Sequence, residues 1–129
     1  MIIETPISVG ELVDKITILR IKSRKIKNAD KLKNVGAELD KLQYVFSGLT
    51  KNSIPDIINE FVMLESINKE LWDIEDQIRK KEMLEEFDGE FIELARSVYI
   101  TNDKRSEVKK KINEMTGSEL VEEKSYEQY

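Results

Sequence analysis

The sequence NKELWDIEDQIR, from Asn68 to Arg79, decides the fold because it combines a helical repeat of apolar residues with polar residues on the same face. It contains the only tryptophan of the chain, Trp72. Apolar residues in and around this stretch recur at intervals of three and four, as on one face of an α-helix: Ile57, Phe61, Leu64, Ile67, Leu71, Ile74 and Ile78. The spacing predicts one long helix over about 55–83, with Pro55 in its first turn.

A helix of roughly 29 residues would be about 43 Å long. That is long for a small bundle, so part of it should project beyond the other helices or pack on another subunit. A homodimer through this helix is therefore one expectation.

Two helices are expected before the long one. Thr5-Pro6 favours an extended N-terminal arm, because proline disfavours helical geometry in the residue before it. The sequence SVGE at 8–11 matches a capping box and predicts a helix that ends near residue 27. Asp30 is the expected N-cap of the next helix, whose apolar residues keep heptad spacing: Leu32, Val35, Leu39, Leu42, Phe46 and Leu49.

A fourth helix is expected after the Asp88-Gly89 turn, with Gly117 as its C-terminal cap. Its middle, SVYITND at 97–103, joins β-branched residues to Asn and Asp, which are poor residues for a helix interior. Either the helix kinks there, or packing overrides the local preference.

Length and composition favour a single all-α domain over residues 1–129. The chain is long enough to bury one core, and 40% of its residues are hydrophobic. Two prolines and five glycines leave few helix breakers. Four helices joined by short loops predict an up-down bundle.

The composition also excludes several kinds of site. The chain has no cysteine and no histidine, so thiolate or imidazole metal sites, cysteine nucleophiles and Ser-His-Asp triads are absent. No cofactor or metal is expected. The N-terminus lacks the features of a signal peptide, and no apolar run is long enough to span a membrane, so a cytoplasmic protein is expected. A net charge of −5 argues against nucleic acid as the main partner.

The polar residues of the long helix and the fourth helix should meet at one level of the bundle. Folding the chain back near residue 87 places Asn102 opposite Trp72, and Arg105 opposite Asn68 and Lys69. The resulting polar layer comprises Asp14, Asn68, Trp72, Glu75, Asn102 and Arg105, with Asp73, Asp76, Arg79 and Tyr99 near its edge. The candidate ligand-binding residues are Asn68, Trp72, Glu75, Tyr99, Asn102 and Arg105.

This layer has two interpretations. It is a pocket for an anionic or hydroxylated ligand, with Arg105 as donor and Trp72 as stacking face. Alternatively it is a structural network in which Arg105 pairs with Glu75 and the asparagines fix the register of the helices. We favour the network, because helical bundles often contain satisfied polar core residues.

Three other constellations are weaker. Acidic pairs at i, i+3 resemble those of all-α nucleotide pyrophosphatases that bind Mg²⁺ or Mn²⁺, but a chain with 26 acids contains such pairs by chance. A chorismate mutase-like cavity is an analogy of fold alone. The basic segment 20–33 lies near acidic residues that offset it, so it is best explained as a solvated face. The acidic pairs are Glu70 and Asp73, Glu82 and Glu85, and Glu90 and Glu93.

Four blocks together resemble a family of small bacterial and phage proteins, a domain of unknown function. They are SVGELVDKITILRIK at 8–22, NKELWDIEDQI at 68–78, FIELARSVYITNDKR at 91–105 and EEKSY at 122–126. The resemblance implies a shared fold and no assigned catalytic residue. Because EEKSY is one of the blocks, the resemblance also implies that the C-terminal tail packs on the bundle.

The function expected from these patterns is a non-enzymatic binding or adaptor module that recognises a partner protein or a small anionic ligand. The alternative is a small enzyme that acts on a sugar or nucleotide phosphate at the polar layer.

Overall fold

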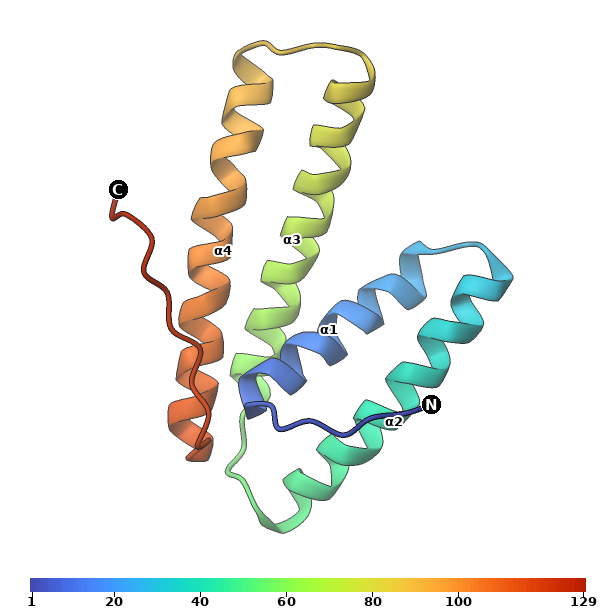
Figure 1. Ribbon diagram of the computed structural model, residues 1–129, viewed down its shortest axis with the longest axis vertical. Coiled ribbons are helices and arrows are strands. Elements are labelled where there is room, and N and C mark those ends of the chain that lie inside the picture. Colours follow the sequence, from blue (N-terminus) through green and yellow to red (C-terminus); the bar gives the residue numbers. More distant parts are fainter.

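The protein consists of four α-helices and no strand, in a computed structural model that describes all 129 residues (Figure 1). Each helix runs antiparallel to the one before it (Figure 1). The predicted all-α class and bundle of four helices are therefore confirmed. The helices are α1 (Val9–Lys25), α2 (Ala29–Asn52), α3 (Ile58–Met83) and α4 (Gly89–Thr116).

The bundle is open, because α1 is the only helix that packs against all of the others. α3 and α4 form one hairpin, and α1 and α2 form another that diverges from it (Figure 1). α1 crosses the lower part of the α3–α4 hairpin, whose upper part extends beyond it (Figure 1). The backbone of α2 lies close to α1 alone. None of the four helices has the length and apolar character needed to cross a membrane.

The helix ends follow from local capping. The side chain of Ser8 accepts a hydrogen bond from the backbone N–H of Glu11 at 3.0 Å, which confirms the predicted start of α1. Asn28, rather than Asp30, caps α2, since its side chain accepts from the N–H of Lys31 at 3.0 Å. Gly117 ends α4 in the left-handed conformation, with φ of 63°.

The long helix begins later than predicted. Residues 55–57 are irregular, and α3 starts at Ile58, whose N–H donates to the carboxylate of Asp56 at 2.9 Å. Ile57, just before the helix, turns its side chain into the core and is 3% exposed. α3 has 26 residues and α4 has 28, so the hairpin contains two long helices. α4 is helical throughout 97–103, so packing overrides the local preference there.

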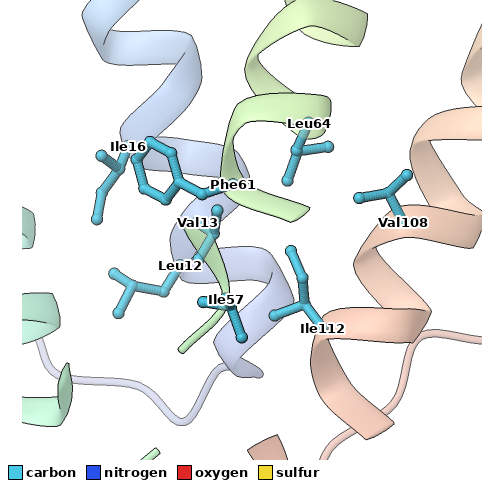
Figure 2. Close-up of a cluster of buried hydrophobic side chains, with 8 residues drawn as sticks. All are labelled: Leu12, Val13, Ile16, Ile57, Phe61, Leu64, Val108 and Ile112. Atoms are coloured by element: carbon cyan, nitrogen blue, oxygen red, sulfur yellow. The ribbon is translucent and has the colours of Figure 1, made fainter. Parts of the chain in front are cut away.

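The core lies where α1 crosses the lower ends of α3 and α4 (Figure 2). α2 contributes at its edge, where Phe46 packs against Phe61 with the ring centroids 5.7 Å apart. The apolar residues of α2 are mostly half-buried, because α1 is the only helix whose backbone lies close to it. The central cluster consists of Leu12, Val13, Ile16, Ile57, Phe61, Leu64, Val108 and Ile112.

The tail after Gly117 has no regular secondary structure and lies along α4 (Figure 1). Glu122 forms an ion pair with Lys109 at 2.9 Å. At the end of the chain, the ring of Tyr129 stacks on Tyr99 with a centroid distance of 5.3 Å. The tail therefore contacts the bundle at separate points along α4, while its side chains stay largely exposed.

Candidate functional site

The site is built on the close crossing of α1 and α4, which depends on Gly10. The backbone N–H of Gly10 donates to the side-chain oxygen of Asn113 at 2.7 Å. A Cβ atom at residue 10 would lie 2.6 Å from the carbonyl oxygen of Lys109, well inside contact distance. Glycine thus allows the two backbones to approach, and this approach brings the charged residues of α4 against those of α1.

Asp14 of α1 lies at the centre of the site and is only 1% exposed. Arg105 of α4 binds it with two donors, Nε to Oδ1 at 3.0 Å and Nη2 to Oδ2. Asn68 of α3 donates its side-chain amide to Oδ1 at 2.8 Å. A bidentate guanidinium and an amide therefore replace the water that an ionised carboxylate would otherwise need.

Thr17 completes the connection between α1 and α3. Its hydroxyl accepts a second hydrogen bond from the Asn68 amide at 3.0 Å and donates to the carbonyl oxygen of Asp14 at 2.9 Å. Asn102 of α4 accepts a longer hydrogen bond from Arg105 Nη1 at 3.4 Å. These five residues, Asp14, Thr17, Asn68, Asn102 and Arg105, form what we term the Asp14 network. It links three helices through one carboxylate.

The electrostatics of the network favour the charged forms. Burial alone would raise the pKa of Asp14, but hydrogen bonds from Arg105 and Asn68 outweigh burial and hold this pKa below its ordinary value. The hydrogen bonds to Asp14 likewise raise the pKa of Arg105. At neutral pH both groups are therefore charged, with Asp14 buried and Arg105 partly exposed.

Lys109, one helical turn beyond Arg105, has three carboxylate neighbours. Its ammonium nitrogen lies 2.7 Å from Glu11, 2.9 Å from Glu122 and 3.4 Å from Asp14, and its side chain is 8% exposed. Burial alone would lower the pKa of Lys109, but hydrogen bonds to Glu11 and Glu122 outweigh burial and raise it. The hydrogen bond from Lys109 lowers the pKa of Glu122. We term Lys109, Glu11 and Glu122 the Lys109 site.

An open hollow adjoins the Lys109 site and has a volume of about 270 Å³. On one side it is bounded by the end of the N-terminal arm and the start of α1, and on the other by the tail. Its lining residues are Ile7, Ser8, Glu11, Leu120, Val121 and Glu122. A second hollow of about 280 Å³ lies between the end of α2 and the start of α3 and includes Phe46 and Pro55.

The structure brings together three of the six candidate residues. Asn68, Asn102 and Arg105 all belong to the Asp14 network. Glu75 is exposed and pairs with Arg79 at 2.8 Å, so the partner of Arg105 is Asp14 and not Glu75.

Trp72 and Tyr99, the two aromatic candidates, take no part in the hydrogen bonds of the Asp14 network. Trp72 is half-buried on α3, and its indole forms no side-chain hydrogen bond. Tyr99 is exposed and stacks on Tyr129. Neither hollow described above is lined by any of the six candidate residues.

Sequence reasoning missed Lys109, Glu11, Thr17 and Glu122. A signal was present, because Arg105, Lys109 and Asn113 recur at intervals of four and therefore form one polar row on α4. Asp14 and Glu11 have the matching spacing of three on α1. A search for polar rows as well as apolar stripes would have found both.

The acidic residues of the chain form no cluster of three or more arranged to hold a metal ion. At the turn between α3 and α4, three acidic residues surround the ammonium group of Lys81. Lys81 lies 3.0 Å from Glu86, 3.1 Å from Asp88 and 3.2 Å from Glu90. These ion pairs close the turn.

The fold and the site define a small all-α bundle protein whose helices are joined by a buried ion-pair network. The chain belongs to DUF6165, a family of unknown function whose model matches residues 2–129. This match confirms the resemblance to a family of unknown function. Neither a curated protein nor a solved structure matches the chain.

Proposed function

We propose that the protein is a non-enzymatic binding module that recognises a carboxylate-bearing ligand at Lys109. One observation carries the proposal. The ammonium of Lys109 forms ion pairs with three carboxylates, of which Glu11 accepts a hydrogen bond at 2.7 Å. Glu11 and Asp14 belong to α1, but Glu122 comes from the tail. One of the three positions is therefore filled by a segment outside the helical bundle.

Glu122 is the partner that a ligand can replace. Its side chain is 51% exposed, whereas Asp14 is 1% exposed and held by three residues. Arg105 and Lys109 together balance Asp14 and Glu11, so Glu122 is a surplus acid at the site. A ligand carboxylate that displaces Glu122 leaves the local charge unchanged.

The complete pairing of the Asp14 network argues against catalysis at the polar layer. Every fully buried side-chain nitrogen or oxygen has a hydrogen-bond partner. An enzyme that acts on a sugar or nucleotide phosphate at this layer would need a free acid, base or cation beside a cavity. Here Arg105 is engaged with Asp14, and Asp14 is kept ionised by its partners. We therefore assign the layer a structural role and the Lys109 site a binding role.

Thermal unfolding with two simple probes, succinate and inorganic phosphate, tests the proposal. A ligand that binds only the folded state raises the midpoint of unfolding in proportion to its occupancy. Succinate should raise the midpoint of the wild-type chain in a saturable manner, and Lys109→Gln should abolish this rise. Lys110→Gln is the matched control, because Lys110 is the exposed neighbour of Lys109 and should leave the response unchanged.

Besides the absence of a saturable succinate response in the wild-type chain, two results would contradict the proposal. The first is an equal succinate response in the Lys109→Gln and Lys110→Gln chains, which would mean a general salt effect. The second is a Lys109-dependent response to phosphate with none to succinate, which would assign the site to phosphoryl compounds.

A further inference from the structure

We infer that the ligand of the Lys109 site is an extended acidic peptide segment of a partner protein, and that the chain's own tail occupies the same site as an internal competitor. This assignment rests on the proposed function and adds the class of partner and a means of regulation. The contacts of residues 118–122 with the bundle support it.

Within residues 118–122, the tail contacts the bundle at two points four residues apart. At the first, the hydroxyl oxygen of Ser118 accepts from the backbone N–H of Val9 at 3.4 Å. This N–H belongs to the first turn of α1 and has no partner within its helix. At the second, Glu122 binds Lys109 at 2.9 Å. The two points match an extended segment better than a small ion, which would reach only one of them.

Between these points the tail fits loosely. Leu120 and Val121 line the hollow of about 270 Å³ but remain 46% and 44% exposed. Ile7, across the hollow, is 39% exposed. A substantial part of the apolar surface on both sides therefore stays in water. A partner segment with larger apolar side chains before its acidic residue would bury more of this surface and bind more tightly than the tail.

The covalent link favours the tail despite this loose fit. A tethered segment has an effective concentration in the millimolar range, so a free peptide must compete against it. Weakening the contact of the tail with Lys109 should therefore increase the apparent affinity for a peptide added in trans. The residue whose change weakens this contact with the least disturbance is Glu122, because it is exposed and lies outside the helices.

Fluorescence anisotropy with a labelled peptide of residues 118–129, SELVEEKSYEQY, tests the inference on the full-length chain. The Glu122→Gln chain should bind this peptide several-fold more tightly than the wild-type chain. Glu123→Gln is the matched control, because Glu123 is the adjacent exposed acid and has no ion pair, and it should bind as wild type does. A peptide that carries Glu122→Gln should bind none of the chains.

Equal peptide affinity of the Glu122→Gln and Glu123→Gln chains, or no binding by either, would overturn the inference. If no chain binds the peptide, but succinate still raises the unfolding midpoint of the wild-type chain and not that of the Lys109→Gln chain, the inference is wrong and the proposed function stands. If the peptide does not bind and succinate does not stabilise the wild-type chain, both the inference and the proposed function are wrong. A wild-type dimer that dissociates only in Glu122→Gln would assign the site to the tail of a second copy, which also overturns the inference.

Discussion

At the scale of single residues, Asp14 determines how the interior is organised. An ionised carboxylate that is 1% exposed is costly unless it is paired and hydrogen-bonded. Arg105, Asn68 and Lys109 supply that pairing from two other helices. Such a pair adds little net stability compared with apolar residues of the same volume, but the loss of one partner leaves the other charge buried and alone.

Arg105→Ala should therefore lower the free energy of unfolding by about 3 kcal/mol, because it strands the Asp14 carboxylate. Equilibrium unfolding in urea measures this change. Arg79→Ala is the control, since the pair of Arg79 and Glu75 lies on the surface of α3 and Arg79 is 76% exposed. It should change stability by less than about 0.5 kcal/mol. Similar small losses in both variants would contradict a structural role for Arg105.

The sequence allows Arg105 to be placed in a polar layer but does not identify its partner. Counting along two antiparallel helices predicts that Asn68 and Arg105 lie at one level, and both donate to Asp14. The partner depends on how α1 is rotated about its axis and how close it lies to α4. That rotation follows from tertiary packing, which the periodicity of a single helix does not contain. Glu75 was expected as the partner on spacing alone, and it faces solvent.

At the scale of elements, α1 connects the two halves of the molecule. It is the helix with the most buried residues, and it alone packs against all of the others. Gly10 sets the depth of its crossing with α4, because a Cβ atom there would meet both the Lys109 carbonyl oxygen and the side chain of Asn113. The crossing in turn places Glu11 and Asp14 beside Lys109.

Gly10→Ala should thus destabilise the protein by about 1–3 kcal/mol, the usual cost of overpacking a close contact. Gly36→Ala is the matched control within a helix, because nothing lies within 4 Å of a Cβ atom built at residue 36. It should stabilise the protein by up to about 1 kcal/mol, since alanine favours helix more than glycine does. Midpoints of urea unfolding for the two variants should therefore move in opposite directions. A rise of the midpoint in both variants would mean that the α1–α4 contact is not tight.

The helices themselves were largely predictable, because caps and apolar spacing are local signals. Ser8 caps the start of α1 and Gly117 caps the end of α4, both as predicted. The start of α3 was not predictable from Pro55, because the chain first turns Ile57 into the core. The segment 97–103 is helical although its residues disfavour a helix interior. It belongs to α4, which packs along α3, and Thr101 within it is only 2% exposed, so tertiary packing overrides the local preference.

At the scale of the whole molecule, the surface is larger than that of a compact monomer. The accessible surface is 9334 Å², whereas a compact protein of 15.1 kDa has about 7,100 Å². Part of the excess comes from the end of the α3–α4 hairpin, which extends beyond α1 (Figure 1). Large apolar side chains at that end are exposed: Met83, Leu84, Phe87 and Ile92.

An exposed apolar end of this kind favours association, and the predicted homodimer through α3 offers one way to cover it. Static light scattering at micromolar concentration should then give a mass twice the chain's own 15.1 kDa. Phe87→Ser, which removes an apolar side chain that is 57% exposed, should shift the mass toward that of one chain. A wild-type mass of one chain would exclude the dimer and would not affect the Lys109 site.

We propose that a ligand carboxylate and the Glu122 carboxylate compete for the same position beside Lys109. The most direct measurement is a succinate titration of the ¹⁵N-labelled full-length chain, followed through the backbone amides of Glu122 and Glu11 by NMR. We predict that both amides shift with the same midpoint, and that the Glu122 amide moves to the position typical of a disordered chain as the tail leaves Lys109. Saturation at Glu11 with an unmoved Glu122 amide, or no saturable shift at either residue, would contradict the claim.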